Sequence, residues 1–206
     1  MSALIGRIGP LLFLLAACGA PLAQADELAA PALVAELRRG GYVLYIRHTS
    51  TDFSRNDAKM TSYEDCAGQR PLTERGRDEA RAIAAHLKRL AIPIGRVYAS
   101  PFCRTVETAM LAFGRAERTQ EVRGGPLQSD DPRRYDALKA LLSAVPAPGQ
   151  NNVVSSHGNP FYAVFGPPYL AEGEIAVVRP GRIDDPSARF EAVARIRLAD
   201  WAALQR

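Results

Sequence analysis

The sequence has no long apolar segment after its first 25 residues, and it has neither internal repeats nor low-complexity stretches. The first absence excludes a later membrane-spanning helix, which needs about 20 consecutive apolar residues. The charged fraction of 23% is ordinary, and the hydrophobic fraction of 47% argues against wholesale disorder. A chain of 206 residues with this composition is expected to fold as one domain with a real core.

Strong charge of one sign is also lacking. The chain has 26 lysines and arginines against 22 aspartates and glutamates, a net charge of +4. The basic residues are scattered and are not interleaved with aromatic residues, so nucleic acid is not an expected partner. A small cationic surplus suits an anionic substrate instead.

Histidine is scarce, with three residues in the chain. His48 and His157 follow short apolar segments, whereas His86 lies inside a predicted helix and is interpreted as a partly exposed residue without a chemical role. Two histidines without a close cluster of carboxylates make a poor metal site. We therefore expect no metal and no other cofactor.

The first 25 residues have the pattern of an export signal. Arg7 precedes an apolar run at residues 10–17, and an Ala-Gln-Ala sequence ending at Ala25 offers the small residues of a cleavage site. The predicted organisation is a signal peptide at 1–25 and a folded domain at 26–206. Alternatively, the Leu-Ala-Ala-Cys sequence ending at Cys18 resembles a bacterial lipobox, so that the signal ends at residue 17 and Cys18 carries a lipid anchor. Both alternatives predict a location outside the cytoplasm, as a periplasmic or secreted protein or as a membrane-anchored lipoprotein.

Two cysteines, Cys66 and Cys103, remain after removal of the signal. An even number of cysteines in an oxidising compartment favours a disulfide between them. Such a crosslink would contribute roughly 3–4 kcal/mol on the chain-entropy model. The alternative is a pair of buried thiols.

Apolar periodicity predicts strands that alternate with helices. It favours strands at 42–46, 96–99, 119–122, 153–156, 175–178 and 190–198, and helices at 28–39, 74–90, 101–113 and 132–145. Thr73 is expected to cap the second helix, and Ser100 the third, with Pro101 at its first position. The alternation predicts an α/β three-layer sandwich with a mostly parallel central sheet flanked by helices. The long polar segment at 49–71 is typical of a functional loop.

Three predicted strands end in polar sequences, which are Arg47-His48, Ser100-Pro101 and His157-Gly158. The carboxyl ends of parallel strands meet at one edge of a sheet, where ligands bind. A histidine that attacks phosphorus must be unprotonated, and a neighbouring arginine both disfavours its charged form and binds phosphate. Arg104 lies near a helix start that favours anions, and His157 can donate a hydrogen bond to a phosphoryl oxygen.

Four segments, in this order, resemble motifs of the histidine phosphatase superfamily, the group related to phosphoglycerate mutase. They are Arg47-His48-Thr49-Ser50-Thr51 (RHG-x-T), Pro71-Leu72-Thr73-Glu74-Arg75-Gly76 (L-T-x-x-G), Ser100 to Ala109 (S-x-x-x-R-x-x-x-T-A) and His157-Gly158-Asn159 (HGN). Order and spacing agree from about Gly41 to Val178. The resemblance implies a phosphoglycerate mutase-like fold, a phosphohistidine at His48, a phosphate pocket formed by Arg47, Arg104 and His157, and no metal.

Three further residues occupy motif positions, which are Thr49, Thr51 and Asn159. Thr51 is counted among the substrate-binding residues, although it and Asn159 are expected to orient neighbours rather than to react. Thr49 stands where the motif has glycine. Its added Cβ would either narrow the approach to His48 or supply a hydrogen-bond donor.

The general acid is not identified by the motifs. Relatives place a glutamate where this chain has Ser129, and Asp130 is adjacent. Glu121 lies earlier, and Glu172 and Glu174 lie later, where both are expected on one face of a strand near the edge of the pocket. An acid that protonates the leaving alkoxide contributes 10²–10⁴-fold. Glu174 is slightly preferred over the other three.

The resemblance implies a histidine acid phosphatase, a phosphoric monoester hydrolase that acts on a small or cell-envelope sugar phosphate. One alternative is a non-catalytic phosphate-binding member of the same fold. Another is a phosphomutase, which export disfavours because mutase substrates are intracellular intermediates. A cysteine phosphatase is excluded because its loop needs arginine six residues after cysteine, where this chain has Leu72 and Ala109.

Overall fold

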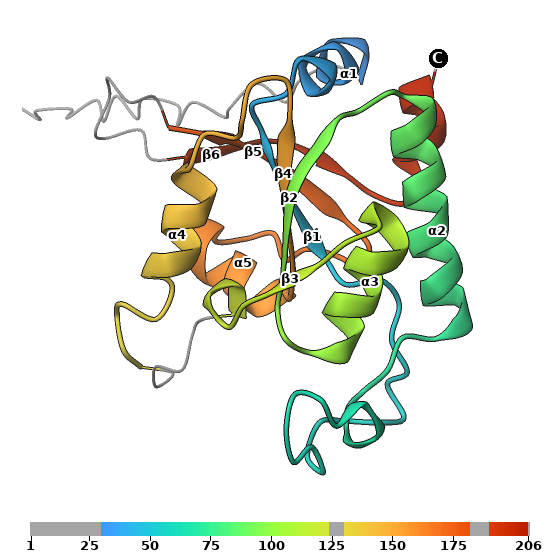
Figure 1. Cartoon of the computed structure of the whole chain (residues 1–206), viewed down its shortest axis with the longest axis vertical. Helices are drawn as coiled ribbons and strands as arrows, with labels where there is room; N and C mark the ends of the chain where they lie inside the picture. The colour runs from blue at the N-terminus through green and yellow to red at the C-terminus, as the bar shows by residue number, and fades with distance from the viewer. Residues whose placement is uncertain (1–29, 124–129, 182–189, 206) are drawn as a thin grey trace, which may run out of the picture.

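A six-stranded sheet lies between two layers of helices (Figure 1). The structure is a computed structural model, and it describes residues 30–123, 130–181 and 190–205. The expected signal segment, Cys18 and Ser129 lie outside these residues, as does most of the connection between the last two strands. Within the described part, no helix has the length and apolar character needed to cross a bilayer.

The sheet is mixed, with its parallel strands on one side. The strands are β1 (Val43–Arg47), β2 (Ile94–Ala99), β3 (Glu117–Arg118), β4 (Asn151–Ser156), β5 (Ile175–Pro180) and β6 (Phe190–Ile196), in the order β3-β2-β4-β1-β5-β6. β4 pairs in parallel with β1 and β2, and β2 pairs in parallel with β3. β5 is antiparallel to β1 and to β6. The predicted α/β sandwich with a mostly parallel sheet is confirmed.

Both faces of the sheet are covered. The helices are α1 (Ala30–Arg39), α2 (Glu74–Arg89), α3 (Cys103–Phe113), α4 (Asp136–Ser143) and α5 (Gly158–Phe165). Leu44 and Ile46 of β1 join the core under α1, α2 and α3, while Val43 and Tyr45 join the core under α4 and α5. The continuous apolar run of β1 thus reflects burial on both faces.

Helix α2 begins as predicted, and its first turn explains one of the motifs. Thr73 caps the helix, since its Oγ1 accepts a hydrogen bond from Gly76 N at 3.0 Å. A Cβ at position 76 would lie 2.1 Å from the carbonyl oxygen of Ser50. Glycine at this position therefore allows the segment that follows His48 to pack against the helix start.

Three boundaries differ from the predictions. Helix α3 begins at Cys103 with Phe102 as the N-cap residue, not at Ser100-Pro101. The expected strand at 119–122 is the short β3 at Glu117–Arg118, and a 3₁₀ turn, η2 (Glu121–Arg123), follows it. Helix α4 spans Asp136–Ser143 and is shorter than the expected helix at 132–145.

The polar segment between β1 and α2 has little regular structure apart from a 3₁₀ turn, η1 (Cys66–Gly68). The predicted disulfide links Cys66 to Cys103, with a Cα–Cα distance of 5.7 Å. It joins this segment to the first residue of α3. His86 is partly buried in α2, where its ring stacks on that of Trp201 with the centroids 5.4 Å apart.

Candidate active site

A polar cavity of about 490 Å³ opens where β1, β2 and β4 end. Two histidines and five arginines contribute to its lining, which are His48, His157, Arg47, Arg70, Arg104, Arg123 and Arg134. The structure thus brings together the four residues that the sequence placed at this edge of the sheet, and it adds three arginines. The positive charge and the arginine donors make this cavity suited to an anion.

His48 follows β1 and is 1% exposed. Its Nδ1 lies 3.0 Å from the carbonyl oxygen of Thr49, which can only accept, so Nδ1 carries the proton of the neutral ring. Burial, followed by the charges of Arg104 and Arg47, lowers the pKa of His48 to about 3. The ring is therefore neutral at physiological pH, with an unprotonated Nε2 suited to attack on phosphorus.

Thr49, which replaces the motif glycine, is buried and does not line the cavity. Its backbone nitrogen donates to Oγ1 of Thr108 at 3.2 Å, and the two hydroxyl oxygens also lie 3.2 Å apart. The Thr49 side chain therefore forms a hydrogen bond to α3, in line with the expectation that it supplies a hydrogen-bond donor.

Arg47 and Arg104 are each held in place by a hydrogen-bond acceptor. Nη1 of Arg47 donates to the carbonyl oxygen of Leu170 at 2.8 Å, and Nη1 of Arg104 donates to Oδ1 of Asp57 at 2.9 Å. The Nε of each arginine is buried without a partner among the described residues. Buried donors of this kind need an acceptor, which a bound phosphate would supply.

His157 follows β4, and its ring lies 5.6 Å from that of His48. Its Nε2 is 2.8 Å from the hydroxyl oxygen of Ser100. Burial and the nearby His48 and Arg104 lower the pKa of His157, so its ring is neutral as well. If the hydroxyl donates to Nε2, the proton of the ring resides on Nδ1. Ser100, predicted as a helix cap, instead orients this second imidazole.

The HGN segment is fixed by packing against Tyr169. A Cβ at position 158 would lie 2.0 Å from the ring of Tyr169, so a larger residue there would displace that ring. The Tyr169 hydroxyl donates to Oδ1 of Asn159 at 2.6 Å. This bond holds the Asn159 side chain, and Asn159 also lines the cavity.

Thr51 does not line the cavity, so its assignment to substrate binding is not supported. Its backbone nitrogen and its hydroxyl donate to the carboxylate of Glu172 at 3.2 and 2.6 Å. Oε1 of Glu172 lies 3.7 Å from Nδ1 of His48 and 3.6 Å from Nη2 of Arg47. Glu172 therefore faces the side of the His48 ring away from Nε2, where it can position the ring but cannot protonate a leaving group.

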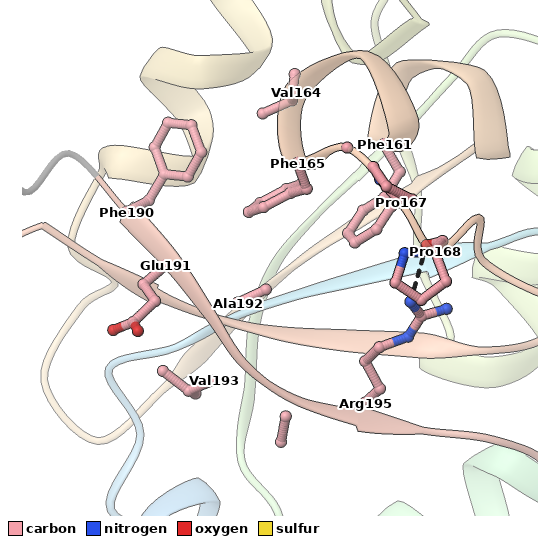
Figure 2. A pocket seen from close by; sticks show the side chains of 12 residues that line it. Phe161, Val164, Phe165, Pro167, Pro168, Phe190, Glu191, Ala192, Val193 and Arg195 are labelled. Carbon is pink, nitrogen blue, oxygen red and sulfur yellow. Dashed lines mark hydrogen bonds between the residues drawn. The ribbon is translucent and has the colours of Figure 1, made fainter. Parts of the chain in front are cut away.

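The preference for Glu174 as the acid does not fit the structure. Glu174 is 2% exposed and accepts hydrogen bonds from Nε and Nη2 of Arg195 at 2.7 and 2.8 Å. Although burial opposes ionisation, these bonds and the Ala171 backbone N–H lower the pKa of Glu174, so it is a carboxylate. Arg195 lines a different, largely apolar cavity with Phe161 and Phe165, where it points toward Pro168 (Figure 2).

Glu172 and Glu174 were also expected on one face of a strand, and this is wrong. Both lie in the turn before β5, and Gly173 between them donates to the carbonyl oxygen of His48 at 3.0 Å. The two side chains diverge to partners that are far away in sequence.

The other two acid candidates, Glu121 and Asp130, are exposed, and neither lines the cavity. Among residues 30–123, 130–181 and 190–205, the cavity lining contains no carboxylate. In the same part of the chain, no group of three or more His, Cys, Asp or Glu side chains is arranged to hold a metal ion.

Sequence reasoning missed the additional arginines. Arg70 directly precedes the L-T-x-x-G motif, and this adjacency is the one signal that could have indicated it. Its backbone nitrogen donates to Asp57 at 2.9 Å, the same oxygen that binds Arg104. Nothing in the sequence separates Arg134, which lines the cavity, from Arg133, which is exposed and paired with Asp131.

The structure is that of an α/β protein whose polar cavity is lined by two neutral imidazoles and five guanidinium groups. The family model described as "Histidine phosphatase superfamily (branch 1)" matches residues 43–125. A structure of the protein histidine phosphatase SixA complexed with tungstate is 25% identical, with a TM-score of 0.52, over 77% of this chain and 98% of that chain. Residues 43–125 therefore resemble the histidine phosphatase superfamily in sequence, and the fold resembles that of a solved phosphatase of this kind.

A mycobacterial glucosyl-3-phosphoglycerate phosphatase is 17% identical over 74% of this chain and 96% of that chain, with a TM-score of 0.46. A comparison with curated protein sequences gives no match.

Proposed function

We propose that the protein is a metal-independent phosphatase that moves a phosphoryl group from its substrate to Nε2 of His48 and then to water. The supporting observation is the neutral His48 ring, whose Nδ1 is engaged by Thr49 while its Nε2 is free to attack. Arg47, Arg104 and His157 would hold the three equatorial oxygens of the phosphoryl group. The N–P bond forms as the bond to the leaving group breaks, and water then releases inorganic phosphate.

The replacement His48→Ala tests this proposal. We expect it to abolish hydrolysis of an aryl phosphate and to prevent trapping of an acid-labile phosphohistidine. His86→Gln, a change of the histidine outside the cavity, serves as the matched control and should retain activity. Wild-type activity in His48→Ala would overturn the assignment. Tight phosphate binding with neither turnover nor phosphohistidine would instead indicate a non-catalytic binding protein.

We further propose that the protein works outside the cytoplasm on a small or cell-envelope sugar phosphate. The export pattern at residues 1–25 supports this location, with a lipid anchor at Cys18 as the alternative. Mass spectrometry of the mature N-terminus distinguishes cleavage after Ala25 from lipidation. A screen of phosphomonoesters with the mature protein tests the substrate class.

A second candidate activity is hydrolysis of phosphoramidates such as phosphohistidine. It is favoured by the lack of a carboxylate among the described cavity residues, because an imidazole protonated on its other nitrogen leaves without an acid. One solved relative is named a protein histidine phosphatase. Rates on an alkyl phosphate, an aryl phosphate and phosphoimidazole decide between the candidates. Rapid hydrolysis of the alkyl phosphate would indicate an acid and exclude the phosphoramidate preference.

A further inference from the structure

The cavity holds more positive charge than one phosphoryl group requires. Of its five arginines, Arg47 is paired with Glu172 at 3.6 Å and Arg104 with Asp57 at 2.9 Å. Within the described ranges, Arg70, Arg123 and Arg134 form no ion pair. Since both histidines are neutral, three uncompensated guanidinium groups face a single cavity.

Two of these arginines come from neighbouring elements of the fold. Arg123 belongs to η2 and Arg134 precedes α4, and these two elements pack against each other. Arg123 lies 5.3 Å from the ring of Phe102, and its Nη1 donates to the Tyr63 hydroxyl at 2.7 Å. These contacts hold its guanidinium group at the cavity wall without neutralising it.

Arg134 gives the stronger indication of a bound ligand. Its guanidinium carbon lies 5.6 Å from the ring of Tyr135, and its Nε is buried without a partner among the described residues. A buried charged donor without an acceptor is costly, so a ligand is expected to supply one. Arg133, its neighbour in sequence, is exposed and bonded to Asp131 through Nε and Nη2.

The cavity volume of about 490 Å³ falls in the range of sites that enclose a small organic molecule, and a phosphate ion alone would leave most of it empty. The cavity therefore has room for a second group of the substrate near Arg123 and Arg134. Bidentate binding by arginine favours a phosphate or a carboxylate in that place.

We propose that Arg123 and Arg134 form a second anion subsite, so that the substrate carries a further phosphate or carboxylate beside the phosphoryl group that meets His48. This inference rests on the proposed function and specifies its substrate class as doubly anionic small molecules. The inner subsite takes the phosphoryl group that is transferred, and the outer subsite takes the group that remains.

Binding of sugar phosphates to the His48→Ala protein tests the subsite without turnover. Isothermal titration compares fructose 1,6-bisphosphate with fructose 6-phosphate and fructose 1-phosphate. We expect the bisphosphate to bind about tenfold more tightly or better. Introducing Arg134→Gln should remove most of that preference, and Arg123→Gln with Arg134→Gln should remove the remainder.

The matched control is Arg133→Gln, which removes the same charge one residue away and should keep the preference. Equal binding of mono- and bisphosphates would overturn the subsite, as would an equal loss of preference in Arg133→Gln and Arg134→Gln. The ratio of kcat/KM values for the same sugars in the protein with His48 intact should follow the binding ratio. If the protein with His48 intact preferred the bisphosphate in binding but neither hydrolysed it nor formed phosphohistidine, the phosphatase proposal would be contradicted and the subsite would remain supported.

Discussion

At the scale of single residues, burial and the neighbouring arginines both oppose protonation of His48. Protonation would add a charge beside Arg47 and Arg104 in a place that is 1% exposed. The folded chain therefore holds the pKa of His48 at about 3, whereas the unfolded chain returns it to about 6.5. Below pH 6.5 the unfolded state binds more protons than the folded state, so stability is lost as the pH falls. The lowered pKa of His157 acts in the same direction.

The variant His48→Asn should reveal this linkage. It removes the titrating ring but keeps an N–H for the Thr49 carbonyl oxygen. Between pH 7.5 and pH 5, the wild type should lose about 2 kcal/mol more unfolding free energy than the variant, because one proton is taken up only on unfolding. Urea unfolding at the two pH values measures the difference. Parallel losses in both proteins would mean that His48 is not held neutral.

The catalytic candidates differ in how far the sequence could place them. His48 and His157 directly follow strands, so their meeting at one edge of the sheet could be predicted. The direction of Glu174 could not, because it is set by Arg195, 21 residues away. Likewise, the role of Glu172 depends on Thr51, 121 residues away. A turn with two glutamates two residues apart carries no local signal of which partner each will find.

At the scale of elements, the segment between β1 and α2 is held by specific links and not by regular structure. The disulfide joins it to α3, and the backbone nitrogen of Cys103 donates to Oε1 of Gln69 at 2.8 Å. Asp57 of the same segment accepts from Arg70 and Arg104. The order of this segment and the position of Arg104 are therefore coupled.

Replacing Cys66 and Cys103 together by serine should weaken both stability and binding. We expect a loss of roughly 3–4 kcal/mol in unfolding free energy, since the unfolded chain gains the entropy of an open loop. Phosphate affinity should fall as well, because Asp57 would hold Arg104 less firmly. Urea unfolding and titration calorimetry measure the two effects, and wild-type protein in dithiothreitol should reproduce both. A serine variant with unchanged stability would show that the crosslink does not constrain the unfolded chain.

Helix starts show where local signals are sufficient and where they are not. Thr73 has its partner Gly76 three residues away, so the cap and the helix start could be predicted. Ser100 has the same local signal, but its hydroxyl bonds to His157, 57 residues away, and the helix begins later. The hydrogen bond to the distant His157 therefore takes the place of the predicted helix cap at Ser100.

At the scale of the whole molecule, the layers could be predicted but the strand directions only in part. The alternation of strands and helices predicts a covered sheet. The residues of β5 are almost continuously buried, and such a pattern reads the same in a parallel or an antiparallel strand. The antiparallel pairing of β5 with β1 and β6 therefore had no signal in the apolar pattern.

The cavity arginines come from separate segments of the chain. Their mutual repulsion lowers the stability of the whole fold. A divalent anion that neutralises them should stabilise the entire domain. Inorganic phosphate at 100 times its Kd is expected to add about 2.7 kcal/mol to the unfolding free energy and to raise Tm accordingly. Thermal unfolding in phosphate and in sodium chloride of equal ionic strength measures this effect, since general screening acts in both salts.

Two variants show where the stabilisation by phosphate arises. Arg104→Gln should remove most of the stabilisation by phosphate, because the buried Nε of Arg104 has no hydrogen-bond acceptor among the described residues. Arg133→Gln changes the net charge equally but alters an exposed residue, and it should keep the full effect. Equal rises of Tm in phosphate and chloride, or the same behaviour of the two variants, would mean that the arginines only respond to ionic strength. The cavity would then not be a site built for phosphate.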